Sequence, residues 1–531
     1  MIKLSEEEAM KDFCMILEFH QPYRLNRNFN SLYYAGEEDF RKVFDAYFDD
    51  GLNELIFRGV TRRCYLPLSE LILEQAERLR REGKEFRLAY SLSGLFIEQC
   101  KRWEPKLIEL IGELVDLGYV ELLGQTYYHS LSGLYGPERI EFKRQVEMHS
   151  SLMDGLFGLK PEVFENTECL YNMSIARAID DMGFEGIVTE GADRILKGRS
   201  PNYVYRAKGC GLKVLLRNYR LSDDIGFRFS SRSWCEWPLT SEKYVRWIEW
   251  TPGESIVVFI DSETFGEHHS RESGIFDFLK ALIRKIAESR YLVWSTPSEI
   301  LEKRDERGVI DVDDFSTVSW ADLERDTSAW LGNGMQLTVY ESIKSLGPLV
   351  RSLGDETFYT VWRRLQSSDH LYYMSTKSGG PGEVHGYFNP YGSPYEAFTV
   401  YLRVLADFEV RLKVRLEETG RREARYLFPV PSDKAFTFYR EFARSMNLRV
   451  RSLHDLLSAL RSVDIKSIEF HSERGDFGRW VRQVIGDMEL AEVLDEASSL
   501  GLVGEKLRRK LIEALEARIA EVEGGGSPIF K

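Results

Sequence analysis

Two carboxylates follow an apolar run near the middle of this 531-residue chain. Residues 256–260 are β-branched except for Phe259, and Asp261 and Glu263 come directly after them. A run of this kind predicts a strand buried on both faces. In α/β folds the catalytic groups lie at the carboxyl ends of parallel strands. We therefore interpret Asp261 and Glu263 as candidate catalytic carboxylates, and a solvated acidic loop is the competing interpretation.

Other short apolar runs also end on polar or aromatic residues. The run at 14–19 ends on His20 and Gln21, and Pro22 stops that strand. The residues after the runs at 118–123 and 163–164 include Gln125, Tyr127, Tyr128, His129 and Glu168. Adjacent tyrosines beside a glutamine and a histidine suit a sugar, because sugar faces stack on rings and sugar hydroxyls need donors and acceptors. A structural histidine at a strand end is the alternative for His20.

Composition narrows the class of protein. The chain is 43% hydrophobic and 13% aromatic, which predicts a fully folded protein of two to four domains. Its formal net charge of -14 argues against binding to nucleic acid or to anionic membranes. Six scattered cysteines without a CxxC pair, a charged start and no apolar run of about 20 residues predict a cytoplasmic protein. The many Glu, Arg and Lys residues are compatible with a thermophilic source.

Alternating strands and helices over residues 10–300 predict an α/β fold with a parallel, barrel-like sheet of seven or eight strands. Helical patterns dominate after residue 300, and a Pro-containing segment at 428–431 predicts a linker. We expect three domains: a catalytic barrel (1–300), a helical domain that completes the active site (301–428) and a small, mostly helical C-terminal domain (433–531).

Five ordered motifs resemble those of glycoside hydrolase family 57. They are His20–Gln21–Pro22, residues 124–131, Asn166–Thr167–Glu168, residues 261–266 and residues 326–333. Their flanking residues are most similar to the archaeal α-amylase-type branch, and the resemblance covers about residues 10–420. The tail from residue 433 resembles a small domain of unassigned role that is appended to some archaeal glycan enzymes.

The resemblance implies an incomplete (β/α)7 barrel followed by a helical domain, and hydrolysis with retention of anomeric configuration. It implies Glu168 as the nucleophile and Asp261 as the acid/base. Asp261 must then be protonated when substrate binds, which requires a raised pKa. Glu263 could supply the charge that raises this pKa, or it could be structural. The further residues that we expect to bind substrate are Phe265, His268, Asp326 and Trp330.

We expect no cofactor and no metal requirement. His20, His129 and His268 are interpreted as partners of sugar hydroxyls. Zinc bound by histidines and an aspartate at strand ends, as in deacetylases or some mannosidases, is the alternative. No His-x-Asp or His-x3-His pair accompanies these residues.

The predicted activity is cleavage of α-1,4-glucosidic bonds in starch-like or glycogen-like chains. A 4-α-glucanotransferase would use the same residues and pass the glycosyl unit to a sugar in place of water. A non-catalytic glycan-binding or regulatory protein is the alternative of another class, although both carboxylates are present. Chain-length preference, α-1,6 activity and the formation of a homo-oligomer are left open by the sequence.

Overall fold

Seven strands pair in parallel around a barrel. Their bounds are β1 (Lys11–Phe19), β2 (Leu88–Leu92), β3 (Val120–Leu123), β4 (Val163–Glu165), β5 (Gly186–Glu190), β7 (Lys213–Arg217) and β8 (Ser255–Asp261). β1 pairs with both β2 and β8, β2 with β3, β4 with β5, β5 with β7, and β7 with β8. A parallel bridge from Gly124 to Phe164 joins β3 to β4 and closes the ring. The predicted seven-stranded barrel is therefore confirmed.

Three short strands extend this sheet. β6 (Tyr205–Ala207) pairs antiparallel with β7, and β10 (Val309–Ile310) pairs with β6. β9 (Leu292–Trp294) pairs with the first residues of β1. The computed structural model describes residues 10–136, 139–377, 389–442 and 444–523.

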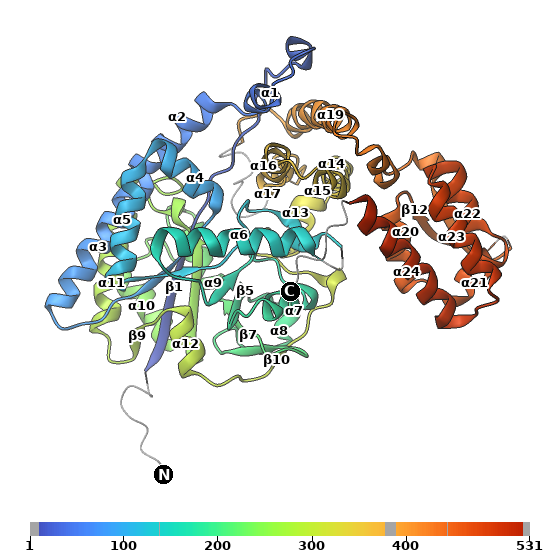
Figure 1. Cartoon of the computed structure of the whole chain (residues 1–531). Coiled ribbons are helices and arrows are strands. Elements are labelled where there is room, and N and C mark those ends of the chain that lie inside the picture. Colours follow the sequence, from blue (N-terminus) through green and yellow to red (C-terminus); the bar gives the residue numbers. More distant parts are fainter. Residues whose placement is uncertain (1–9, 137–138, 378–388, 443, 524–531) are drawn as a thin grey trace. The chain divides into compact units, whose positions relative to one another are not determined.

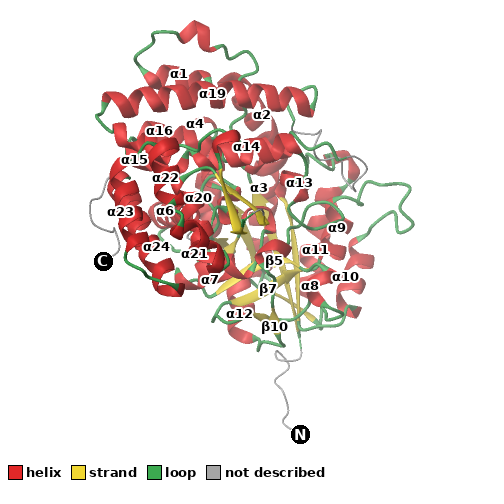
Figure 2. Cartoon of the chain, turned by 90° about the vertical axis from the view of Figure 1, so that its right-hand side faces the viewer, coloured by secondary structure: helices red, strands yellow, loops and turns green. Residues whose placement is uncertain are grey.

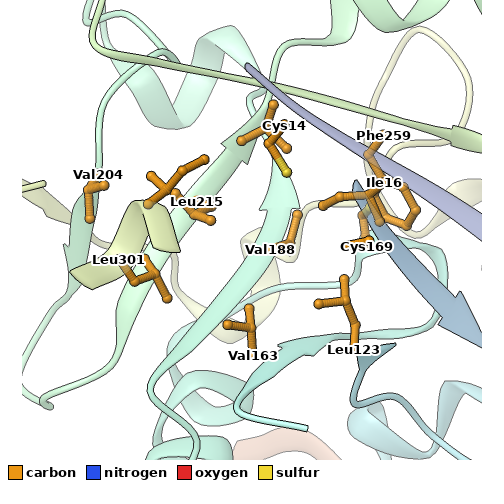
Figure 3. Packing of buried hydrophobic residues seen from close by; sticks show 13 residues of the cluster. Cys14, Ile16, Leu123, Val163, Cys169, Val188, Val204, Leu215, Phe259 and Leu301 are labelled. Atoms are coloured by element: carbon orange, nitrogen blue, oxygen red, sulfur yellow. The ribbon is translucent and has the colours of Figure 1, made fainter. Parts of the chain in front are cut away.

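The barrel interior is filled by apolar side chains, most of them small or branched. Figure 3 shows Cys14 and Ile16 of β1, Val188 of β5 and Phe259 of β8 around a common centre. All four side chains are fully buried. Successive residues of each strand point alternately into the barrel interior and toward the surrounding helices, so both faces of a strand are covered. This packing fixes the strand ends that carry the polar side chains.

Helices surround the barrel strands (Figures 1 and 2). The helices α3 (Leu66–Arg81) and α11 (Ile275–Glu288) lie side by side, and α5 (Pro105–Asp116) packs on α3. Each presents an apolar stripe inward, as Leu279, Leu282 and Ile286 do on α11. The other barrel helices include α2 (Asp50–Val60), α4 (Gly94–Trp103), α6 (Ile140–Phe157), α7 (Met173–Asp181), α8 (Asp193–Leu196), α9 (Tyr219–Gly226), α10 (Ser241–Trp250) and α12 (Pro297–Lys303).

The chain divides into two units that each combine separate segments. The first comprises Met1–Phe29, Asp45–Val339 and Arg364–Tyr401, and it contains the barrel. The second comprises Asn30–Phe44, Tyr340–Arg363 and Leu402–Lys531. Further helices are α1 (Phe40–Ala46), α13 (Ser328–Leu331), α14 (Gly334–Ser345), α15 (Gly347–Leu353), α16 (Glu356–Arg364), α17 (Ser368–Tyr372) and α19 (Pro394–Glu418).

The end of the second unit is mostly helical, as predicted. It holds α20 (Leu453–Ser462), α21 (Ile465–Glu473), α22 (Asp476–Trp480), α23 (Met488–Ser499) and α24 (Gly504–Val522). An antiparallel hairpin of β11 (Phe436–Glu441) and β12 (Arg444–Val450) precedes them. Among the described helices none has the length and apolarity needed to cross a membrane.

Candidate active site

The carboxyl ends of the barrel strands meet around one cavity. Pairing places Glu18 of β1 opposite Asp261 of β8 on one side and opposite Ser91 of β2 on the other. The residues that line the cavity include Glu18, His20, Gln21, His129, Glu168, Arg217, Asp223, Asp261, Glu263, His268, Trp320, Asp322, Arg325, Asp369 and Tyr372. All of them belong to the first unit.

Glu168 is held by hydrogen bonds to both carboxylate oxygens. Trp320 Nε1 donates to its Oε2 at 2.8 Å, and Ser368 Oγ donates to its Oε1 at 2.9 Å. His129 Nε2 lies 3.6 Å from the same Oε1. Glu168 has φ 60° and ψ 25°, in the left-handed region that non-glycine residues rarely adopt. Its carboxylate is thus fixed at the cavity wall by partners from three distant parts of the chain.

Left-handed backbone is concentrated at this cavity. His129, Glu168, Asp322 and Arg325 have positive φ values between 47° and 60°. Such conformations cost on the order of 1 kcal/mol or more for a residue with a Cβ, and they persist only where the surroundings fix them. Their presence around one cavity is typical of a functional site.

Asp261 ends β8 and lies half-buried at the cavity wall. Burial and the charge of Glu168 raise its pKa to about 6, although Arg217 and His129 act in the opposite direction. A carboxyl group with this pKa holds its proton near neutral pH far more often than an ordinary aspartate does. It can therefore donate a proton and later take one back.

Glu263 is buried, and both of its carboxylate oxygens accept hydrogen bonds. Its Oε1 accepts from Tyr65 Oη and, at 3.2 Å, from Gln21 Nε2, and its Oε2 accepts from Ser262 Oγ at 3.1 Å. Burial and the charge of Asp261 raise the pKa of Glu263 to about 8. With this pKa the Glu263 carboxyl group is mostly protonated at neutral pH, so it does not act on Asp261 as a fixed negative charge. The principal charge acting on Asp261 is that of Glu168, while Glu263 supports Gln21.

His20 and His129 stack face to face over the cavity floor, with ring centroids 3.9 Å apart and an interplanar angle of 21°. Burial and the neighbouring His129 lower the pKa of His20 to about 4. Its Nε2 lies 2.9 Å from Asp369 Oδ2 and its Nδ1 lies 2.7 Å from Ser93 Oγ. This arrangement suits a neutral ring that donates to Asp369 and accepts from Ser93.

The surroundings of His129 shift its pKa in the opposite direction to that of His20. Burial lowers its pKa, but Glu168 and the charge of Asp369 raise it more, and the pKa lies above its ordinary value. Both ring nitrogens face acceptors: Nδ1 lies 3.3 Å from Gln125 Oε1 and 3.5 Å from Glu18 Oε1, and Nε2 faces Glu168. The pair thus places the ring that takes up a proton more readily beside Glu168 and a neutral ring beside Asp369.

A buried ion network forms one wall of the cavity. Arg217 donates to Glu190 Oε2 at 2.9 Å and to Asp223 Oδ1 at 2.8 Å. Arg325 donates to Oε2 of the same glutamate at 3.2 Å and to Oδ2 of the same aspartate at 3.4 Å. Arg325 is adjacent to the loop that carries Trp320, since its backbone carbonyl accepts from Ser319 N at 3.1 Å. The network therefore ties the Trp320 loop to the ends of β5 and β7.

Six residues predicted to bind substrate do not line the cavity; they are Gln125, Tyr127, Tyr128, Phe265, Asp326 and Trp330. Gln125 is fully buried and donates to Ser91 Oγ at 2.8 Å, so it supports His129 from behind. Tyr127 packs on Gly94, where a Cβ would meet its ring at 2.5 Å, and its hydroxyl donates to Glu98. Tyr128 is 3% exposed.

Phe265, Asp326 and Trp330 contact other parts of the structure. Phe265 is fully buried and packs near Phe276. Asp326 Oδ1 accepts from the backbone and side chain of Ser328, which begins α13. Trp330 is 1% exposed and lies beside Tyr372, with 6.1 Å between ring centroids. In this structure the ring of Trp330 is part of the interior, and the tryptophan that lines the cavity is Trp320.

The cavity contains residues that we did not predict from the sequence. Trp320 lies in the same stretch as Trp330, and only the fold distinguishes them. Arg217 ends the apolar run of β7, and a charged residue at a strand end is the signal that identified Asp261. Asp369, which lines the cavity, and its neighbour Ser368 come from the five-residue helix α17.

No group of three His, Cys, Asp or Glu side chains in the described ranges has an arrangement that could hold a metal ion.

Comparisons with known proteins agree with this architecture. The model of glycosyl hydrolase family 57 matches residues 14–313. A Methanocaldococcus jannaschii protein named "Putative alpha-amylase" is 42% identical over 410 residues, which cover 76% of this chain and 85% of that protein. Two solved structures, both branching enzymes of this family, are similar in fold.

The first branching enzyme is from Thermococcus kodakaraensis and was solved in complex with glucose. It superposes with a TM-score of 0.54 at 16% identity, over 77% of this chain and 92% of that one. The second, from Pyrococcus horikoshii, gives a TM-score of 0.52 at 15% identity, over 78% and 90% of the two chains. At such identities the likeness establishes the fold alone. With the family model matching more than half of its length and a relative at 42% identity, the chain belongs to glycosyl hydrolase family 57.

Proposed function

We propose that this enzyme cleaves α-1,4-glucosidic bonds in starch-like or glycogen-like chains with retention of configuration. Glu168 is the nucleophile and Asp261 is the acid/base. The relative named as an α-amylase supports the substrate class. The observation that carries the proposal is electrostatic: Glu168 and Asp261 line one cavity, and the charge of Glu168 helps to raise the pKa of Asp261 to about 6.

The proposed reaction has two steps. Asp261 protonates the leaving glucosyl oxygen while a Glu168 oxygen attacks the anomeric carbon, which gives a β-linked glycosyl-enzyme. Asp261, now ionised, takes a proton from water, and the water oxygen displaces Glu168. Two inversions restore the α configuration. The hydrogen bonds from Trp320 and Ser368 orient the attacking carboxylate, which supports a geometry set before substrate binds.

Other cavity residues have supporting parts in this proposal. Gln21, His129 and His268 offer donors and acceptors to sugar hydroxyls, and Trp320 and Tyr372 offer aromatic surface. When it is protonated, His129 also places positive charge beside Glu168. In the first step Asp261 becomes ionised while Glu168 becomes a neutral ester, so the negative charge moves from Glu168 to Asp261 and the net charge of the pair stays the same.

Products formed from maltoheptaose test the proposal and separate its variants. Hydrolysis predicts a rising number of reducing ends and shorter chains. Transfer to a second sugar predicts a ladder of longer chains at a constant number of reducing ends. Neither product, from a chain that still folds, would favour the non-catalytic alternative. Glu168→Ala, prepared in parallel, should form neither.

A further inference from the structure

A second cavity is lined by residues that follow β5 and β7 in the chain. Its lining includes Tyr219 of α9, Trp247 of α10 and Trp234 in the segment before α10, with Asp193, Arg220 and Glu236 at its rim. Its volume is about 560 Å³, compared with about 180 Å³ for the active-site cavity. Pockets of several hundred Å³ accept small ligands. There is thus room here for sugar rings beyond those at the cleavage point.

Only a thin wall separates the two cavities. The guanidinium of Arg325, which lines the first, lies 3.9 Å from the ring centre of Tyr219, which lines the second. The successive residues Asp223 and Asp224 of α9 line the first and second cavities respectively. The two cavities are therefore close neighbours.

The lining has the chemistry that binds carbohydrate. Trp234 and Trp247 are half-buried and approach each other at 74°, with 6.1 Å between their centroids, so their faces point in different directions. The rim carries charged groups of both signs: Asp193 and Glu236 accept hydrogen bonds from hydroxyls, and Arg220 donates them. Apolar ring faces next to polar groups match the two surfaces of a glucose unit.

We propose that this second cavity, lined by Trp234, Trp247 and Tyr219, is a separate binding site for α-glucan. It would retain a polysaccharide next to the barrel while Glu168 and Asp261 act on one bond. The choice of ligand class rests on the proposed function. The existence of a second site rests on the cavity and its lining.

The test counts sites for maltotriose on the full-length Glu168→Gln enzyme by isothermal titration calorimetry. This variant removes turnover, and maltotriose is short enough to report individual sites. The same measurement is made after adding Trp234→Ala together with Trp247→Ala. Trp250→Ala is the matched control, because Trp250 belongs to the same helix, is 78% exposed and does not line the cavity.

We expect two sites in the parent, two with Trp250→Ala and one in the double tryptophan variant. One site in the parent and none in the tryptophan variant would support the second site while contradicting glucan binding at the active site. One site in both, two sites in both, or none in the parent would overturn the proposal.

A second variant covers the case in which loss of the tryptophans prevents folding. Asp193→Ala with Glu236→Ala changes only exposed side chains at the rim. It should weaken one of the two sites at least tenfold and leave the other unchanged. Two unchanged affinities in this variant would overturn the proposal.

Discussion

The indole Nε1 of Trp320 lies 2.8 Å from Oε2 of Glu168, although the two residues are 152 positions apart in the sequence. The same tryptophan also donates its backbone N–H to the carbonyl of Glu168 at 3.2 Å. Trp320 therefore holds both the backbone and the side chain of the proposed nucleophile. Its ring also packs on Phe259 inside the barrel, with 4.9 Å between centroids.

Removing the indole N–H should slow the chemical step. Trp320→Phe keeps an aromatic ring but removes the donor to Glu168, and a hydrogen bond to a charged group contributes about 1.5–3 kcal/mol. We expect kcat on maltoheptaose to fall at least tenfold, with KM changed by less than about threefold. Trp250→Phe, on the exposed face of α10, is the control. An unchanged kcat, or an effect confined to KM, would show that Trp320 does not position the nucleophile.

The pKa of Asp261 predicts a fall in activity above about pH 6. General acid catalysis requires the protonated form, so kcat/KM should decrease as pH rises through this value. The positive charge of His129 lowers the pKa of Asp261, and its removal should raise that pKa. We therefore expect His129→Asn to move the alkaline midpoint to higher pH, whatever its effect on the maximum rate.

Control measurements use His454→Asn in the second unit, which should leave the midpoint in place. A midpoint that stays unchanged in His129→Asn, or moves to lower pH, would contradict the assignment of this limb to Asp261.

Glu165 should make the fold less stable at alkaline pH. Burial raises its pKa to about 8, against 4.5 for the ordinary group. Below pH 4.5 the Glu165 carboxyl group is protonated in both the folded and the unfolded state. Between pH 4.5 and about 8 it is ionised in the unfolded state but still protonated in the folded state. Stability is therefore lost as pH rises from about 4.5 to about 8. Glu165→Gln removes this loss.

At pH 9 we expect chemical denaturation to give Glu165→Gln a free energy of unfolding above that of the parent by up to about 5 kcal/mol, with little difference at pH 4. The exposed Glu185→Gln, just before β5, should differ little from the parent at either pH. A Glu165→Gln variant that is less stable at pH 9 would show that the ionised carboxylate is favoured in the folded state.

Removal of residues 433–531 should preserve cleavage within about tenfold, because every residue that lines the active-site cavity precedes position 374. The deletion should still lower the melting temperature. Within the second unit, Ser352 Oγ donates to the carbonyl of Val522 at 3.0 Å and Arg351 pairs with Glu523 at 3.1 Å. A truncated chain that folds but does not cleave glucan would make the tail part of the catalytic machinery and place our domain boundary wrongly.

The barrel was predictable because buried parallel strands carry a strong local signal. The apolar runs at 14–19 and 256–260 correspond to β1 and β8, and the residues that follow them lie at the cavity. Helix boundaries were less predictable. Residues 335–352 look like one helix but form α14 and α15, because Pro348, which lacks a backbone N–H, is tolerated only in the first turn of a helix and α15 begins at Gly347.

Side-chain direction was the part that local sequence could not supply. Trp320 and Trp330 occur in one polar-aromatic stretch, and long-range contacts with Glu168 and Tyr372 decide which of them reaches the cavity. Tyr127 and Tyr128 follow β3 closely, yet they pack away from the cavity lining. A strand end predicts where a loop begins, and the surrounding helices decide where its side chains point.

The central claim, that Glu168 attacks and Asp261 protonates, is tested by the stereochemistry of azide rescue. Asp261→Ala keeps the nucleophile, so an α-glucoside with an acidic phenol leaving group should still form the glycosyl-enzyme. Azide needs no base to attack that intermediate. Two inversions predict the α-glucosyl azide. Glu168→Ala lacks the nucleophile and leaves its face open, so rescue there predicts the β-azide.

The most direct measurement is therefore the anomeric configuration, by NMR, of the glucosyl azide made by Asp261→Ala. The α-anomer, formed together with faster phenol release as azide is added, is the predicted result. The β-anomer from Asp261→Ala would exclude a covalent intermediate on Glu168 and contradict the retaining mechanism.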